Sequence, residues 1–241
     1  MSHRRLLLLS NSSNYGEEYL RYPLSHIRSF LGADCKRVLF VPYAGVRITY
    51  DDYAARVRER FEEIGYGVDS LHEAGDPSRA VEEAEAIAVG GGNTFHLLRG
   101  LYEANLIEAI RERVSQGVPY IGWSAGSNVA CPTIKTTNDM PVVEPPSFKA
   151  LALVPFQINP HYTDERVPNH NGETRMERLL EFIEANPSVT VVGLKEGSAL
   201  RIEGTEIKLL GEKSALVFLK GREIAEYGPQ DSLQFLLQDR A

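Results

Sequence analysis

The sequence is poor in the residues that mark secreted and metal-binding proteins. Its 241 residues include only two cysteines, Cys35 and Cys131, which are too few for a disulfide framework or a cysteine-based zinc site. A reducing, cytoplasmic location is therefore expected, and the sequence predicts neither a metal nor another cofactor. Long apolar runs are missing too. The leucines at 6–9 are followed at once by Ser10, so this run is shorter than the hydrophobic part of a signal peptide and far shorter than a membrane span.

Positive charge is also scarce. The chain has 26 Lys and Arg residues against 33 Asp and Glu residues, which gives a formal net charge of −7, and the basic residues form no block. This composition argues against nucleic acid or an anionic membrane as a partner. It also gives an anionic substrate no overall attraction, so a preference for such a substrate would need a local cation in the site.

Length and apolar content set the expected number of domains. With 43% apolar residues, the chain is long enough for one well-buried domain and too short for two comfortable ones. Residues 1–241 are therefore predicted to form a single domain. The sequence leaves the oligomeric state open between a monomer and a homodimer.

Short apolar runs alternate with longer helical patterns through the first half of the chain. Strand-like runs cover residues 6–9, 38–42, 68–71, 86–89 and 118–123, and helical patterns cover residues 17–30, 52–64 and 94–115. This rhythm predicts an α/β fold with a largely parallel sheet and helices on both faces. After Val189, strand-like pieces separated by Gly, Lys and Glu turns predict hairpins at one end of that sheet: residues 190–194, 199–202, 206–210, 215–219 and 223–227.

The sequence G-W-S-A-G at residues 122–126 matches the G-x-S-x-G nucleophile elbow. An apolar strand-like run precedes it and a helix-compatible segment follows it, which is the context in which the motif has physical meaning. A sharp turn there would project the Ser124 hydroxyl above the carboxyl end of the sheet and point the amide of Ala125 into the same space. Ser124 is therefore a candidate nucleophile and Ala125 a candidate oxyanion donor. The alternative is an ordinary strand-to-helix turn in which Ser124 caps the helix.

A second glycine-rich loop, G-G-G-N-T at residues 90–94, lies between a predicted strand and a predicted helix. It exposes several backbone amides at the start of the helix, so it can complete an oxyanion hole, with Gly92 as the preferred donor. The same amides would also suit a phosphate. The loop lacks the Lys-Ser/Thr of a P-loop and the G-x-G-x-x-G spacing of dinucleotide folds, so it gives nucleotide binding little support.

A serine nucleophile needs a histidine base, and the base needs a carboxylate to orient it. His161 follows an apolar strand-like run and a rigid Asn-Pro pair, which suits a positioned base at the end of a strand. Two carboxylates compete for the third role. Asp139, in the irregular segment 131–173, gives the chain order Ser, Asp, His, whereas Glu196, after a predicted strand, gives Ser, His, Glu. The sequence does not decide between them, because triads occur with several chain orders.

Several separate segments together resemble peptidase E, the family of α-aspartyl dipeptidases: residues 6–11, 41–46, 90–95, 120–128, 131–141 and 157–161, with 172–175 also fitting. They follow the family's order and spacing over nearly the whole chain. The resemblance implies a flavodoxin-like parallel sheet related to the class I glutamine amidotransferases, with serine in place of the usual cysteine at the elbow. It also implies hydrolysis, without a metal, of dipeptides that begin with aspartate.

Carried over by position, the resemblance makes Ser124 the nucleophile and His161 the base, and both Asp139 and Glu196 occupy positions considered for the acid of the triad. Arg175 falls where the family recognises the aspartyl side chain. A guanidinium binds a carboxylate through two parallel hydrogen bonds, whereas a neutral isostere would leave a desolvated cation unpaired. Without the resemblance, Arg175 would be interpreted as an ordinary solvated charge on a helix.

Other functions stay open at this point. A different serine hydrolase, such as an esterase, would use the same scaffold, and a non-catalytic module would use the two glycine loops to hold an anionic metabolite. An amidotransferase is less favoured, because Cys131 lies seven positions after the elbow serine and is interpreted as a small buried residue.

Overall fold

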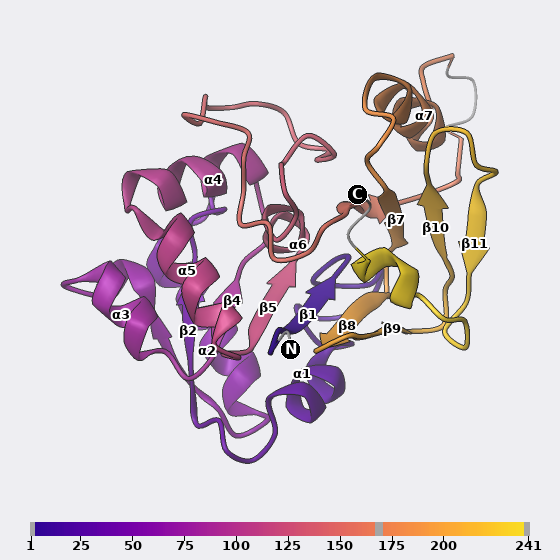
Figure 1. The fold of residues 1–241 in the computed structure, drawn as a ribbon. Coiled ribbons are helices and arrows are strands. Elements are labelled where there is room, and N and C mark those ends of the chain that lie inside the picture. The colour runs from indigo at the N-terminus through magenta and orange to yellow at the C-terminus, as the bar shows by residue number, and fades with distance from the viewer. Residues whose placement is uncertain (1–2, 167–170, 239–241) are drawn as a thin grey trace.

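The molecule contains two β-sheets: helices lie around the larger one, and the smaller one lies at one side of the molecule (Figure 1). The computed structural model describes residues 3–166 and 171–238. The larger sheet has seven strands in the order β3-β2-β4-β5-β1-β8-β9, and the smaller sheet has four in the order β11-β10-β7-β6. This arrangement confirms the predicted α/β class.

Most of the larger sheet is parallel, and its last two strands form an antiparallel hairpin at one edge. Strands β2 to β5 follow the order of the first four strands of flavodoxin, and β1 takes the place of the fifth. In such sheets ligands bind beyond the carboxyl ends of the strands, where the strand order reverses, which here is between β2 and β4. The strands are β1 Arg5–Leu9, β2 Arg37–Val41, β3 Gly67–Ser70, β4 Ile87–Val89, β5 Tyr120–Trp123, β8 Ala199–Glu203 and β9 Glu206–Leu210.

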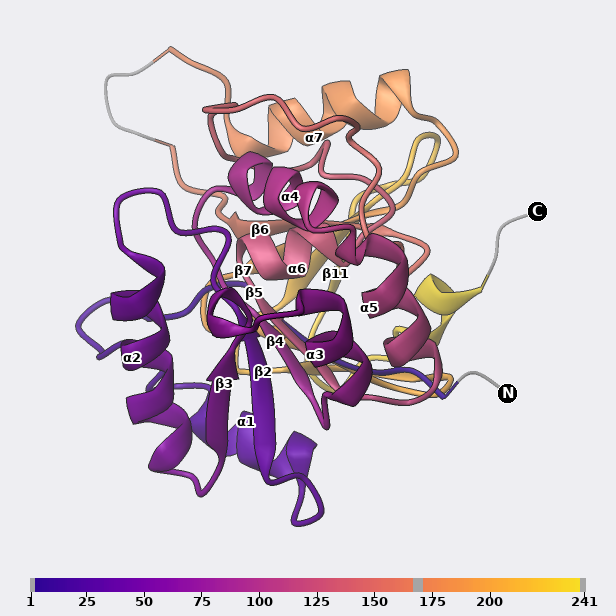
Figure 2. The ribbon, with the colours of Figure 1, turned by 90° about the vertical axis from the view of Figure 1, so that its left-hand side faces the viewer.

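Helices cover both faces of the larger sheet, as predicted. Leu6 and Leu8 of β1 belong to one buried cluster, and Leu7 and Leu9 belong to another, because successive side chains of a strand point to opposite faces. Helices α3 to α6 pack on the first cluster, and α1 and α2 pack on the second (Figure 2). Within the described residues no helix is long and apolar enough to cross a membrane. The helices are α1 Leu24–Leu31, α2 Tyr50–Glu62, α3 Pro77–Glu83, α4 Thr94–Glu103, α5 Leu106–Ser115, α6 Ala125–Val129 and α7 Arg175–Ala185, with short 3₁₀ helices at Leu71–Glu73 and Gln234–Leu237.

The prediction of one helix over residues 94–115 is wrong, because the structure has two helices there, α4 and α5. Between them Asn105 adopts a left-handed backbone conformation with φ 55° and ψ 37°. Asparagine enters this region more readily than most residues, so the chain can turn at this point. The helix predicted over 17–30 begins only at Leu24, after a series of turns, and the sequence pattern does not predict α3.

The smaller sheet combines one parallel and two antiparallel pairings. Helix α7 packs against it through Leu179 and Ile183. Each strand-like piece after Val189 is a strand, but only the β8–β9 hairpin extends the larger sheet. The β10–β11 hairpin belongs instead to the smaller sheet, which corrects the prediction of hairpins at one end of a single sheet. The strands are β6 Gln157–Tyr162, β7 Val191–Lys195, β10 Ala215–Phe218 and β11 Ala225–Tyr227.

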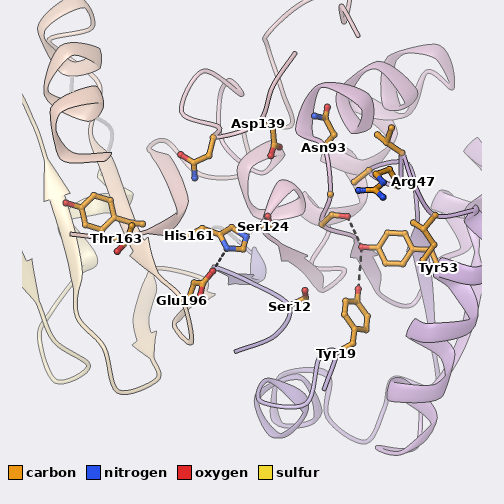
Figure 3. A pocket seen from close by; sticks show the side chains of 18 of the residues that line it. Ser12, Tyr19, Arg47, Tyr53, Asn93, Ser124, Asp139, His161, Thr163 and Glu196 are labelled. Carbon is orange, nitrogen blue, oxygen red and sulfur yellow. Dashed lines mark hydrogen bonds and ion pairs between the residues drawn. The ribbon is translucent and has the colours of Figure 1, made fainter. Parts of the chain in front are cut away.

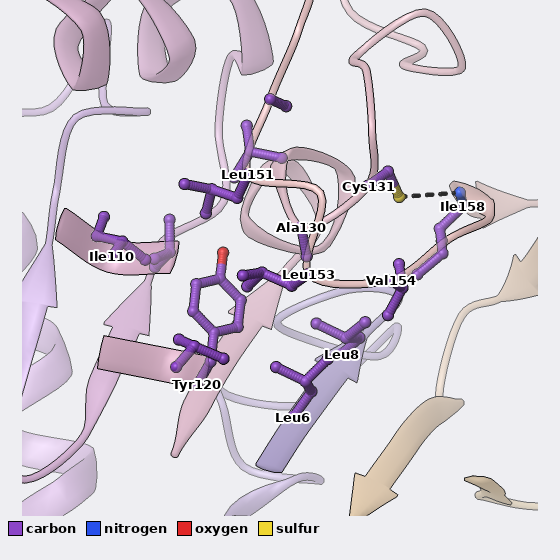
Figure 4. Packing of buried hydrophobic residues seen from close by; sticks show 14 of the residues in the cluster. Leu6, Leu8, Ile110, Tyr120, Ala130, Cys131, Leu151, Leu153, Val154 and Ile158 are labelled. Atoms are coloured by element: carbon purple, nitrogen blue, oxygen red, sulfur yellow. Dashed lines mark hydrogen bonds between the residues drawn. The ribbon is translucent and has the colours of Figure 1, made fainter. Parts of the chain in front are cut away.

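A single buried cluster runs from one sheet to the other. Leu6 and Leu8 of β1, Tyr120 of β5 and Ile158 of β6 all belong to it (Figure 4). The hydroxyl of Tyr120 is fully buried and donates a hydrogen bond to Gly126 O at 2.7 Å, so its one polar group is satisfied. The shared core fixes the two sheets relative to each other, which matters because both contribute to the site.

Candidate active site

Ser124 occupies the sharp turn between β5 and α6. Its φ of 52° and ψ of −111° lie outside the regions that residues with a side chain usually adopt, as the nucleophile elbow requires. The turn is fixed by hydrogen bonds from the Ser124 N–H to Leu9 O at 3.1 Å and from the Ser127 N–H to Ser124 O at 3.0 Å. The side chain of Ser124 therefore has a defined position at the carboxyl edge of the larger sheet.

His161 connects this serine to a carboxylate. It lies in β6 with φ 53°, and the register of β6 against β7 shifts between Asn159 and Tyr162. His161 Nε2 lies 2.9 Å from Ser124 Oγ, and His161 Nδ1 lies 2.6 Å from Glu196 Oε1 (Figure 3). Both ring nitrogens are thus engaged, one by the candidate nucleophile and one by a carboxylate. This is the hydrogen-bond pattern of a Ser-His-acid triad.

Two polar residues directly after β1 hold the base and the carboxylate in place. Ser10 Oγ accepts the N–H of His161 at 2.8 Å, and Asn11 Oδ1 accepts the N–H of Gly197 at 2.8 Å, next to Glu196. Sequence reasoning missed both residues. Their place in the sequence could have indicated them, because both are small polar residues directly after a buried strand. That strand, β1, is parallel to β5, so the residues after the two strands lie at the same edge of the sheet.

Asp139 lies elsewhere, at the start of α4. Its Oδ2 accepts hydrogen bonds from the Thr94 N–H at 2.7 Å, the Thr94 hydroxyl at 2.6 Å and the Thr137 hydroxyl at 3.1 Å. A carboxylate is favoured there because the first N–H groups of a helix lack partners within the helix and carry partial positive charge. Of the two carboxylates left open by the sequence, the structure brings Glu196 to His161 and keeps Asp139 at the helix.

The two predicted oxyanion donors lie beside Ser124. Ala125 is the first residue of α6, so its N–H has no partner within the helix. Gly92 has φ 134°, and a Cβ there would lie 2.3 Å from Ala44 O, so only glycine fits. A Cβ on Gly91 would lie 3.1 Å from Ser124 Cβ, which means that the loop packs directly on the serine. Among the hydrogen bonds of the described residues, the N–H groups of Gly92 and Ala125 donate none, which leaves them available to a ligand.

A cleft of about 1580 Å³ brings these groups together. Segments that follow β2 and β4 line it, in agreement with the position where the strand order reverses. Besides Ser124 and His161, the charged residues that line it are Arg47, Asp52, Arg56, Asp139, Asp164, Glu165, Arg175, Lys195, Glu196 and Lys213. Five of these side chains are cationic and five are carboxylates, so the lining is balanced in charge, although the chain as a whole is acidic.

Arg175 is the first residue of α7, where Thr174 and Glu177 form a capping box. Its guanidinium is half-buried, and burial, followed by repulsion from Arg178, lowers its pKa, while attraction to Asp139 raises it. Within the described part of the chain Arg175 takes part in no ion pair. A partly desolvated cation that no carboxylate of the described residues contacts in an ion pair is suited to receive an anionic group of a ligand.

One trio in the described ranges has the spacing for a metal ion. The ligand atoms of Asp51, His72 and Glu73 all lie within 4.8 Å of one another. His72 is already engaged, with Nδ1 2.7 Å from Ser70 Oγ and Nε2 2.9 Å from Asp51 Oδ1. These residues do not line the cleft that holds Ser124.

Cys131 is a core residue, as predicted. It is 0% exposed, burial raises the pKa of its thiol to about 12, and its Sγ accepts the N–H of Ile158 at 3.1 Å (Figure 4). A thiol that keeps its proton and lacks solvent access is inert as a nucleophile. The serine, and not this cysteine, occupies the elbow.

The chain is similar over most of its length to known peptidases. A model of peptidase family S51 matches residues 6–210. Peptidase E from Nostoc sp. is 55% identical over 98% of this chain and 97% of its own length, and peptidase E from Shewanella amazonensis is 51% identical over 89% and 91%. Among solved structures, a peptidase from an acI-B1 actinobacterium is similar in fold, with a TM-score of 0.70 at 18% identity over 97% of this chain and 98% of that one.

Proposed function

The chain belongs to peptidase family S51, and from that premise we propose that it is a cytoplasmic serine exopeptidase that releases the N-terminal aspartate from dipeptides without a metal. The observation that carries the proposal is the hydrogen-bond chain from Ser124 through His161 to Glu196. An ordinary helix-capping serine would have no reason to contact a histidine that is itself held by a carboxylate.

In the first half of the proposed reaction, Ser124 Oγ forms a bond to the carbonyl carbon of the aspartyl residue while its proton moves to His161 Nε2. Glu196 holds the ring in the correct tautomer and stabilises the imidazolium. The N–H groups of Gly92 and Ala125 donate to the oxyanion of the tetrahedral intermediate. One such donor contributes roughly 10²–10³-fold to kcat. When the intermediate collapses, the C–N bond breaks and His161 gives its proton to the leaving amine.

In the second half, water hydrolyses the aspartyl ester on Ser124. His161 takes a proton from the water as its oxygen bonds to the acyl carbon. The bond between that carbon and Ser124 Oγ then breaks, and the proton returns to the serine. Aspartate leaves and the starting enzyme is restored.

Arg175 is the proposed selector of the substrate. The aspartyl β-carboxylate would receive two parallel hydrogen bonds from its guanidinium. An asparaginyl side chain has the same shape but would leave the cation unpaired and offer its own N–H groups to a donor. The half-buried, unpaired state of Arg175 supports this assignment.

The test is hydrolysis of Asp-Leu and Asn-Leu by the purified protein, with and without EDTA, beside the Ser124→Ala variant. Cleavage of Asp-Leu alone, insensitive to EDTA and reduced on the order of 10⁶-fold in the variant, is expected. Cleavage of ester substrates but of neither peptide would favour a different serine hydrolase. If a serine-directed fluorophosphonate also fails to label the wild-type protein, the non-catalytic module becomes the better hypothesis.

A further inference from the structure

Tyr53 lies directly beneath the glycine loop of the site. It belongs to α2 and is 6% exposed. Its hydroxyl donates a hydrogen bond to Gly91 O at 2.8 Å (Figure 3). The loop closes tightly on this hydroxyl, because a Cβ added to Gly90 would lie 2.5 Å from the Tyr53 oxygen.

The direction of this hydrogen bond is fixed by its acceptor, because a carbonyl oxygen can only accept, and two further contacts agree with it. Trp123 Nε1 donates to the Tyr53 oxygen at 3.3 Å, and the Tyr19 hydroxyl donates to it at 3.4 Å. A phenol has one proton to donate and two lone pairs to accept with, so these two contacts leave the Tyr53 proton only the path to Gly91 O. Burial raises the pKa of Tyr53, so the hydroxyl keeps this proton at neutral and moderately alkaline pH.

The acceptor of the bond belongs to the oxyanion hole. Gly91 C=O and Gly92 N–H are the two ends of one peptide group. A hydrogen bond to the carbonyl draws electron density toward its oxygen and makes the N–H of the same group a stronger donor. It also holds the plane of that peptide, and therefore the direction of the N–H, while the substrate carbonyl becomes tetrahedral.

We propose that Tyr53 is a positioning residue of the oxyanion hole, which orients and polarises the Gly91–Gly92 peptide from the side opposite to the substrate. This inference rests on the proposed function, because it takes Gly92 as an oxyanion donor. Trp123 precedes the nucleophile in the chain, so the same hydrogen-bond network connects the elbow to the glycine loop.

The simpler alternative is that Tyr53 only fills the core, where its ring packs edge-on against Phe40 with 4.9 Å between centroids. The Tyr53→Phe variant keeps the ring and removes the hydroxyl, so it separates the two roles. Tyr66→Phe is the matched control. Tyr66 is also buried, at 5% exposure, and its hydroxyl proton lies between two carbonyl acceptors away from the cleft, Gly32 O at 2.9 Å and Arg28 O at 3.2 Å.

We expect Tyr53→Phe to lower kcat for Asp-Leu about tenfold with little change in KM, a smaller loss than the roughly 10²–10³-fold that follows removal of a donor itself. Inhibition by an aspartyl boronate, whose tetrahedral adduct fills the oxyanion hole, should weaken by the same factor, whereas inhibition by free aspartate should not. Tyr66→Phe should change none of these values. Equal losses in both variants, or a rise in KM with kcat unchanged, would overturn the proposal.

The rate of labelling by a fluorophosphonate provides a readout that does not depend on the substrate. The phosphoryl oxygen also needs the oxyanion hole, so Tyr53→Phe should label several-fold more slowly than the wild-type protein and Tyr66→Phe. If Asp-Leu is not cleaved but labelling follows this pattern, the substrate assignment fails and the role of Tyr53 stands. If Tyr53→Phe does not fold, Tyr19→Phe, which removes one donor to Tyr53, should show the same signature more weakly, and unchanged rates in that variant would refute the role.

Discussion

At the scale of single residues, His161 decides which carboxylate belongs to the triad. Its ring has two nitrogens, and both are engaged, by Ser124 and by Glu196. The sequence left Asp139 and Glu196 open, because the order of residues along the chain carries no information about their distance from His161. Local motifs were enough to select Ser124, His161, Gly92 and Ala125 for the proposed roles, whereas the carboxylate that contacts His161 depends on how β6 and β7 pair.

Replacing each carboxylate by its amide separates their roles. Glu196→Gln is expected to lower kcat by roughly 10²–10⁴-fold, because the amide can donate to His161 Nδ1 and favour the wrong tautomer. Asp139→Asn should mainly weaken the start of α4, at a cost of about 0.3–1 kcal/mol in the free energy of unfolding. Steady-state kinetics and urea unfolding of both variants measure this, and a larger loss of kcat in Asp139→Asn than in Glu196→Gln would contradict the assignment.

Arg175 should control discrimination between acidic and neutral substrates. Arg175→Ala is expected to lower kcat/KM for Asp-Leu by roughly 10–100-fold, the worth of a charge-assisted hydrogen-bonded pair, and to change the rate for Asn-Leu little. Arg178→Ala is the control, because Arg178 is exposed and lies 3.7 Å from Glu173. A similar loss in the control would show that net charge at the cleft, and not a specific contact, selects the substrate.

At the scale of elements, the sequence pattern identified strands better than helices. Each apolar run of the first half became a strand of the larger sheet, because a strand buried on both faces has a compact apolar signature. The pattern over 94–115 was continuous in apolar spacing and therefore gave no sign of the break. The break depends on one backbone conformation, that of Asn105, which periodicity does not register.

The turn between α4 and α5 offers a test of that explanation. Asn105 is exposed, so its replacement changes the backbone preference and few contacts. Asn105→Ala should lower the free energy of unfolding by about 1 kcal/mol, since residues with a Cβ disfavour the left-handed region, whereas Asn105→Gly should be close to neutral. Urea unfolding of the two variants measures the difference, and an equal effect of both would mean that the left-handed conformation is not what the position requires.

At the scale of the whole molecule, the site exists only because two sheets are packed on one core. Ser124 follows a strand of the larger sheet, and His161 and Glu196 belong to or follow strands of the smaller one. The sequence predicted strands in both regions but placed all hairpins on one sheet. Which strands pair over a long distance in the sequence depends on how side chains pack throughout the molecule, and a local sequence pattern does not contain this information.

The shared core should also make stability depend on pH. Burial raises the pKa of Cys131 to about 12, so the folded protein keeps a proton that the unfolded chain releases above its ordinary thiol pKa of about 8.5. The stabilisation is complete below that value and is lost as the pH rises toward 12. Between these two pKa values, each such thiol lowers the free energy of unfolding by about 1.4 kcal/mol per pH unit.

The Cys131→Ala variant isolates this contribution. Its free energy of unfolding, measured in urea under reducing conditions at pH 9, 10 and 11, should fall less steeply than that of the wild-type protein by about 1.4 kcal/mol per pH unit. Cys35 and the buried tyrosines have raised pKa values as well, so part of the slope should persist. Parallel slopes in the two proteins would show that the buried thiol does not titrate as described.

The place of β1 between β5 and β8 has a consequence for the nascent chain. This strand is synthesised well before its partners on either side, which begin at Tyr120 and Ala199. Because translation proceeds at roughly 5–20 residues per second, the four leucines of β1 are made on the order of ten seconds before β5, the first of the two partners. Throughout that interval four leucines that are 0% exposed in the finished protein form an unpaired apolar segment, open to chaperones and to other unfinished chains.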